Sequence, residues 1–128
     1  METHLPKYLS LGELYACYRP HSDGTLDETV EMIDNAINYC RRNGIGSLLI
    51  NITRASGFPS PSVAERYLFI KRWARTASGK VVVSLVAPPS MIDPDKIGIT
   101  MATNRGMHAS VFADEADAVE WLLVNSLR

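Results

Sequence analysis

Seven residues of the chain are suited to binding an anion. Six of them follow apolar, strand-like runs, and the seventh lies in the first turn of the helical segment after such a run. The carboxyl ends of parallel strands meet at one edge of a sheet, and ligands gather there. Guanidinium groups at such an edge suit a phosphate, a carboxylate or an acidic peptide. We therefore predict an anion-binding site at this edge. Its candidate residues are Arg19, His21, Arg54, Ser56, Gly57, Phe58 and Arg66.

Arg66 has the most informative position of these residues. It lies three residues after Val63, on the apolar arc of a predicted helix and one turn from the helix start. An arginine held against a core usually has an anionic partner. That partner is either a ligand anion or an internal carboxylate such as Glu65, Asp93 or Asp95, with the arginine stem lying along the edge of the core. The sequence leaves both alternatives open.

Three further cations in the same predicted helix, Lys71, Arg72 and Arg75, form a modestly basic outer face, and Lys80 follows just beyond the helix end. A solvated helix surface explains such a face, and so does a docking surface for an acidic partner. We take the three helical cations as the candidate partner-binding residues.

The chain carries no recognised catalytic or phosphate-binding motif. It lacks G-x-S-x-G, G-x-x-x-x-G-K-[ST] and G-x-G-x-x-G. A triad of Ser56, His21 and Asp93 can be assembled near one end of the sheet, but these residue types are common in loops. The histidines at positions 4, 21 and 108 and the two cysteines lack the spacing of zinc ligands. We expect no catalytic residues, no metal and no cofactor.

Length and charge limit the class of protein further. The chain has 128 residues, of which 46% are hydrophobic, and 13 basic against 14 acidic residues leave a net charge of -1. This balance argues against a strongly basic nucleic-acid-binding protein. The N-terminus lacks a secretory signal, and the longest apolar stretch, residues 81–87, is far shorter than the roughly 20 residues of a membrane helix. We expect one domain over residues 1–128, in the cytoplasm, with Cys17 and Cys40 reduced.

Strand-like and helix-like patterns alternate along the chain. Apolar runs typical of buried strands occupy residues 11–18, 47–53, 80–87 and 107–113, and residues 4–9 could add an edge strand that pairs with residues 12–18. Apolar residues at helical spacing follow each run, beginning near residues 26, 62, 94 and 115. Each crossover is long enough to place the next strand parallel to the last. The pattern predicts an α/β fold with a mostly parallel sheet of four or five strands and about four helices.

The predicted helices carry recognisable start signals. Thr25 precedes the first helix, and Ser62 with Glu65 matches the S-x-x-E capping box at the second. Asp93 followed by proline predicts the start of the third helix, and Asp114 predicts the start of the fourth.

Several segments of the chain resemble the STAS domain, the fold of bacterial anti-sigma-factor antagonists, and in particular its SpoIIAA-like branch. The resemblance covers nearly the whole chain in element order and implies a non-catalytic regulatory or protein-interaction module. The segments that carry it are residues 47–52 (SLLINI), 81–86 (VVVSLV), 104–106 (NRG), 111–115 (VFADE) and 118–122 (AVEWL).

One motif departs from that family. Phosphorylated STAS antagonists share Asp-Ser-Ser/Thr-Gly at the start of the second helix, where phosphate adds charge at a partner-binding surface. The nearest match here is residues 54–57, in which arginine replaces the aspartate and alanine replaces the acceptor serine. We therefore carry no phosphorylation site over to this chain.

Three functional hypotheses follow. The first is the regulatory module, with a protein partner on the basic helix face. The second, suggested by the likeness of the same superfamily to the CRAL-TRIO lipid-carrier domain, is a binder of a small anionic metabolite or lipid in a cavity lined by Arg54, Arg66 and Phe58. The third is an enzyme that uses His21 and Ser56. Pairing of edge strands into a homodimer is a further alternative.

Overall fold

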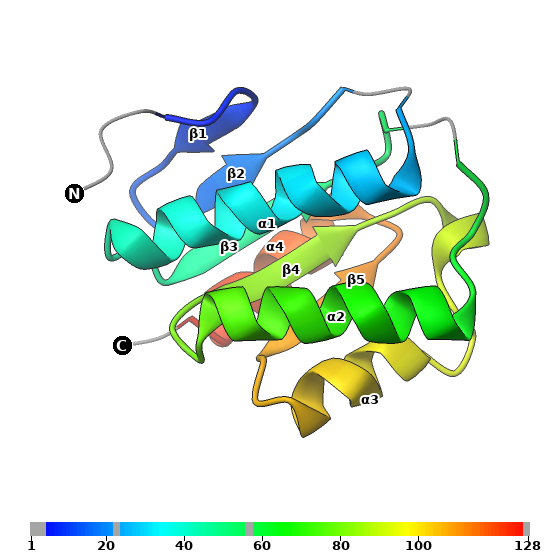
Figure 1. The fold of residues 1–128 in the computed structure, drawn as a ribbon. Helices are drawn as coiled ribbons and strands as arrows, with labels where there is room; N and C mark the ends of the chain where they lie inside the picture. The colour runs from blue at the N-terminus through cyan, green and yellow to red at the C-terminus, as the bar shows by residue number, and fades with distance from the viewer. Residues whose placement is uncertain (1–4, 22–23, 56–57, 127–128) are drawn as a thin grey trace.

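Five strands lie side by side in the order in which they occur in the chain (Figure 1). The computed structural model describes residues 5–21, 24–55 and 58–126. The first strand pairs antiparallel with the second, and the remaining pairs are parallel. The predicted fold class, a mostly parallel α/β sheet with four helices, is confirmed. The strands are β1 (Leu9–Leu11), β2 (Ala16–Tyr18), β3 (Ser47–Asn51), β4 (Val82–Val86) and β5 (Ala109–Phe112).

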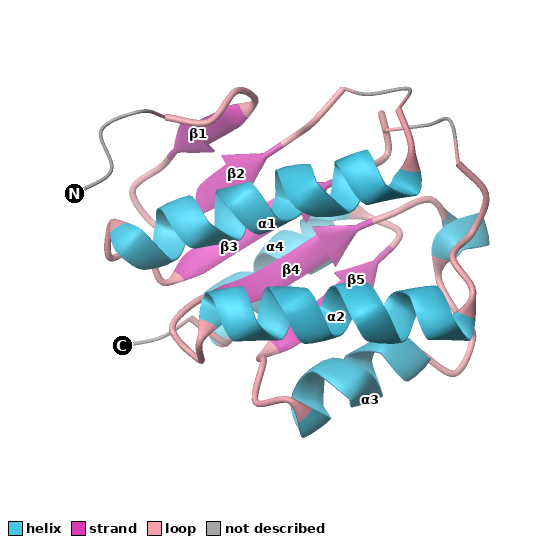
Figure 2. Cartoon of the chain, viewed as in Figure 1, coloured by secondary structure: helices cyan, strands magenta, loops and turns pink. Residues whose placement is uncertain are grey.

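The helices divide unequally between the two faces of the sheet (Figure 2). The three helices that connect parallel strands, α1 (Leu26–Arg42), α2 (Val63–Ala77) and α3 (Ile97–Asn104), pack on one face. Successive right-handed crossovers between adjacent strands place them there. The last helix, α4 (Glu115–Val124), covers the other face. A short 3-10 helix, Pro89–Met91, follows β4.

The interior strand β4 is buried on both faces, as its sequence predicts. Successive side chains of a strand point to opposite faces, so Val82 and Val86 pack with the α4 residues Ala118 and Leu122. Val83 belongs instead to the core under α1, α2 and α3. The sheet therefore separates two apolar cores.

The predicted caps fix the starts of three helices. The Thr25 and Ser62 side chains accept backbone N–H groups at 3.1 Å, and Glu28 and Glu65 accept the cap residues' own N–H groups at 2.8 Å. Asp114 accepts the N–H of the second residue of α4 at 2.9 Å. Because these donors have partners, the first turns of α1 and α2 begin where the sequence indicates.

The prediction of one strand over residues 11–18 is wrong. The chain turns at residues 12–15, where Gly12 N donates to Tyr15 O at 3.1 Å, and the segment forms a hairpin of β1 and β2. A Cβ on Gly12 would lie 2.9 Å from Tyr15 O, so the turn requires glycine. The antiparallel edge strand expected at residues 4–9 therefore lies at Leu9–Leu11.

The predicted start of the third helix is also wrong. Asp93 Oδ2 accepts the backbone N–H groups of Asp95 and Ile97 at 3.0 and 3.2 Å, so the carboxylate holds a turn ahead of the helix. Lys96 has a φ of 50°, in the left-handed region, and α3 begins after it at Ile97. An aspartate that bonds the backbone two residues on competes with helix formation.

Candidate functional site

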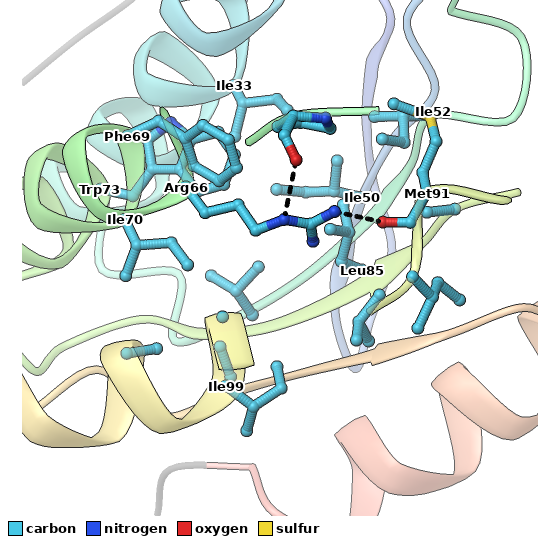
Figure 3. A pocket seen from close by; sticks show the side chains of 18 of the residues that line it. Ile33, Ile50, Ile52, Arg66, Phe69, Ile70, Trp73, Leu85, Met91 and Ile99 are labelled. Atoms are coloured by element: carbon cyan, nitrogen blue, oxygen red, sulfur yellow. Dashed lines mark hydrogen bonds between the residues drawn. The ribbon is translucent and has the colours of Figure 1, made fainter. Parts of the chain in front are cut away.

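An apolar cavity of about 120 Å³ lies between the sheet and helices α1, α2 and α3 (Figure 3). Its sheet wall comes from alternate residues of neighbouring strands, because side chains on one face of a strand recur every second position. These residues are Ile50, Ile52, Val83, Leu85, Ala87, Ala109 and Val111.

The helices and the segment after β4 form the opposite wall. The rings of Phe69 and Trp73 in α2 contact each other in a tilted arrangement, with centroids 4.5 Å apart. The indole N–H of Trp73 donates to the carbonyl oxygen of Val30 in α1 at 3.1 Å. This bond satisfies the polar atom of a buried tryptophan and ties the two helices together. The apolar helical residues on this wall are Leu26, Val30, Ile33, Phe69, Ile70, Trp73, Ile99 and Ala102.

Arg66 extends over this cavity toward Met91 (Figure 3). Its Nε donates to Pro61 O at 3.2 Å, and its Nη2 donates to Ser60 Oγ at 3.1 Å and to Met91 O at 3.3 Å. All three acceptors are uncharged. Among residues 5–21, 24–55 and 58–126, Nη1 has no acceptor, so two N–H donors remain for another group.

Two of the three internal carboxylates proposed for Arg66, those of Glu65 and Asp93, have other partners. Glu65 completes the capping box with Ser62, and Asp93 accepts the two backbone N–H groups ahead of α3. Within the described parts of the chain, no carboxylate lies within salt-bridge distance of Arg66. The half-buried guanidinium therefore carries a positive charge that these parts of the protein do not neutralise.

The loop before α2 contributes one of its predicted residues to the cavity. Phe58 is partly buried and lines it beside Arg66. Arg54 is exposed and lies outside the lining, so its predicted place in the cavity is wrong. Ser56 and Gly57 lie outside the residues that the structure describes.

Arg19 lies on the opposite face of the sheet. Its Nη2 forms an ion pair with Glu115 Oε2 at 2.7 Å in the first turn of α4, and its Nη1 donates to Cys17 Sγ at 2.9 Å. Asn51 donates to the other oxygen of Glu115 at 3.0 Å. Cys17 is half-buried, and this burial raises the pKa of its thiol, while Arg19 acts in the opposite sense. The expectation of one shared site for Arg19 and Arg66 is therefore wrong.

His21 is likewise separate from the cavity. It is exposed and stacks on Tyr8 near β1, with ring centroids 5.4 Å apart and an interplanar angle of 14°. In the described parts of the chain, no hydrogen bond joins His21 to Asp93. Ser56, the third residue of the hypothetical triad, lies outside the described residues.

The three predicted partner-binding cations do not share one surface. Lys71 and Arg75 line a small groove of about 150 Å³ together with Ala74 and Arg105. Arg72 turns away and forms an ion pair with Asp34 of α1 at 3.3 Å. Arg105 was not among the predicted residues; it directly follows α3 and lies more than two dozen residues from the others along the chain.

Lys96, which lines the cavity, was also missed. Its nearest sequence signal is the Asp93-Pro94 turn, whose residues match the pattern of a helix start.

Three further observations concern the described residues alone. No group of three or more His, Cys, Asp or Glu side chains there could hold a metal ion. Cys17 and Cys40 are free, and no helix has the length and apolar character needed to cross a membrane.

Comparison with known proteins yields no relative. The chain matches no model of a protein family, no curated protein and no solved structure. The STAS resemblance stays a prediction.

Proposed function

We propose that this protein binds a small molecule with an apolar body and an anionic head, without transforming it, in the cavity between α2 and the sheet. One observation carries the proposal: Arg66 lies over an apolar cavity with two unused N–H donors and no carboxylate partner in the described chain. A guanidinium in such surroundings favours an anion, and a carboxylate or phosphate matches its planar donors.

The size of the cavity restricts the apolar body. An engineered apolar cavity of about 150 Å³ holds benzene and otherwise stays dry. The volume here, about 120 Å³, therefore suits a single ring or a short alkyl chain. A long-chain lipid would need the α2–α3 wall to move outward. Among the ligands expected from the sequence, small anionic metabolites fit this volume better than lipids.

Charge at the cavity supports an acid as the ligand. Among the residues that the structure describes, Arg66 and Lys96 are the cations that line the cavity, and Asp93, the acidic residue of the lining, is held by backbone N–H groups. A neutral molecule of the same shape would leave the positive charge of Arg66 uncompensated. The regulatory function implied by the STAS resemblance is compatible with a bound effector and stays a separate prediction.

A thermal-shift series tests this function. Linear carboxylates from acetate to dodecanoate and benzoate are compared with the matching primary amides. A ligand at about 100 times its Kd stabilises the folded state by about 2.7 kcal/mol, which raises the Tm by several degrees for a chain of this size. We expect an optimum at a short chain or single ring, and a much smaller shift with the matching amides.

Two variants complete the test. Arg66→Met keeps the apolar stem and removes the charge, and we expect it to abolish the carboxylate-induced shift. Arg54→Met removes an exposed arginine outside the lining and should leave the shift intact. A flat response across the series, or equal shifts in both variants, would overturn the proposal.

A further inference from the structure

A groove on the outer side of α2 is lined by three cations and no acidic residue. Lys71 and Arg75 come from α2, Arg105 comes from the C-terminal end of α3, and Ala74 is the remaining lining residue. In the described parts of the chain, no carboxylate lies within salt-bridge distance of any of the three. The groove is therefore a concentrated positive charge in a chain whose net charge is -1.

Arg105 is held in place at this groove. It donates a hydrogen bond to the hydroxyl of Tyr67, and its Cζ lies 5.1 Å from the centroid of the Tyr67 ring. Contact with an aromatic face fixes a guanidinium without neutralising its charge. The fold thus keeps a third cation beside Lys71 and Arg75 despite the repulsion between them.

An exposed apolar surface continues from this basic groove along the same helix. Val63, Tyr67, Lys71 and Arg75 follow one another at four-residue spacing, which places them along one ridge of α2. Val63 is 56% exposed and Tyr67 is 42% exposed. The ridge is therefore apolar toward the start of α2 and basic toward its end.

We propose that this surface binds a short acidic segment of another protein that also carries apolar side chains. Asp or Glu side chains would pair with Lys71, Arg75 and Arg105, and an aliphatic or aromatic side chain would cover the exposed residues near Tyr67. Charge complementarity selects this occupant, because the groove has only cations and its flank is apolar. This inference goes beyond the proposed ligand function and does not depend on it.

Arg72 lies outside this surface. Its pairing with Asp34 places it at the α1–α2 contact, where Asp34 also accepts a hydrogen bond from Thr76 at 2.5 Å. Reversal of the Arg72 charge would therefore act on stability.

Peptide selection tests the inference. A random peptide library displayed on phage is selected on the wild-type protein after depletion on the variant carrying Lys71→Glu and Arg75→Glu. Peptides with Asp or Glu beside an aliphatic or aromatic residue should be enriched. The Kd of a selected peptide, measured by fluorescence anisotropy, should rise at least tenfold in the depletion variant. It should also rise when NaCl increases from about 0.1 to about 1 M, because salt screens exposed charges.

A matched control variant and a single-stranded DNA oligonucleotide distinguish an acidic-peptide site from general attraction of anions. Lys7→Glu combined with Arg54→Glu makes the same change in net charge at exposed cations away from the groove and should leave the Kd unchanged. Circular dichroism and the Tm show that both double variants are folded. Selected peptides without acidic bias, a Kd that responds equally in both double variants, or tighter binding of a single-stranded DNA oligonucleotide than of the peptides would overturn the inference.

Discussion

The Nη2 atom of Arg66 lies 3.3 Å from the carbonyl oxygen of Met91, so one side chain joins the start of α2 to the segment after β4. Its bonds to Ser60 and Pro61 extend this connection to the loop before α2. Both segments follow carboxyl ends of central strands, β3 and β4. Arg66 therefore has two roles at this edge of the cavity, since it fixes two chain segments and presents unused donors to a ligand.

The two roles of Arg66 can be separated by substitution. Arg66→Lys keeps the positive charge and loses the planar set of guanidinium N–H donors, whereas Arg66→Met loses both. Each variant should lower the free energy of unfolding by about 1 to 2 kcal/mol, because hydrogen bonds to backbone carbonyls are lost. Only Arg66→Lys should retain part of the carboxylate-induced Tm shift. Urea unfolding and the thermal-shift series measure the two effects, and an equal loss of the shift in both variants would contradict the charge role.

Leu85→Phe should fill the cavity and block the ligand. Leu85 lies on β4 and lines the cavity, which has room for additional side-chain volume (Figure 3). We expect the free energy of unfolding to change by less than about 1 kcal/mol, whereas overpacking a tight core costs about 1 to 3 kcal/mol. Leu49→Phe is the control, because Leu49 is fully buried on the opposite face against α4. Leu49→Phe should destabilise and leave the ligand-induced shift in place; the reverse pattern would refute the cavity assignment.

Gly98→Ala tests how α3 packs on α2. A Cβ at Gly98 would lie 3.1 Å from the Cδ1 of Ile70, a flexible side-chain end that can shift into the cavity. Alanine in place of glycine inside a helix stabilises the folded state by about 0.5 to 1 kcal/mol. We therefore expect Gly98→Ala to raise the free energy of unfolding modestly. The increase should be larger in an Ile70→Val background, because valine lacks the Cδ1 atom. Gly106→Ala should destabilise instead, because Gly106 has a φ of 76°. Urea unfolding of the two glycine variants, Ile70→Val and the Gly98→Ala/Ile70→Val combination measures these changes in the free energy of unfolding. A lower value in Gly98→Ala that Ile70→Val does not restore would disprove this packing of α3 on α2.

The starts of α1 and α2 were predictable because their signals are local. Capping boxes at Thr25 and Ser62 fix the starts of α1 and α2 to within one residue. The two-sided burial of β4 was also visible in its apolar run, which Ser84 alone interrupts. The hairpin of β1 and β2 was missed, because Leu11 and Leu14 flank the turn residues Gly12 and Glu13 and make the segment resemble one apolar strand.

The candidate site was predicted in part, and its errors have a geometric cause. Arg19 has the same strand parity as Cys17, whose side chain packs toward α4, so the sequence already contained the signal that places Arg19 on that face. Arg66 and Phe58 were correctly expected to line a cavity. Arg105 approaches Lys71 and Arg75 only because α3 packs beside α2, a tertiary contact that no local pattern reports.

Alkaline pH should destabilise the protein through two buried groups. Burial raises the pKa of the Cys40 thiol to about 12 and that of the Tyr18 hydroxyl to about 12. In the unfolded chain these groups ionise near pH 8.5 and pH 10. The folded state therefore binds more protons than the unfolded state in between, so stability is complete below about pH 8.5 and falls as the pH rises toward 12.

Cys40→Ala isolates the thiol contribution. Between about pH 8.5 and 10, the wild-type free energy of unfolding should fall faster with pH than that of Cys40→Ala, and above pH 10 both should fall because Tyr18 is present in each. Urea unfolding at a series of pH values measures the slopes.

Iodoacetamide should alkylate half-buried Cys17 in the folded protein and reach Cys40 only as the chain unfolds, because Cys40 is fully buried. Identical slopes in the two proteins, or rapid alkylation of Cys40 in the folded state, would contradict this burial.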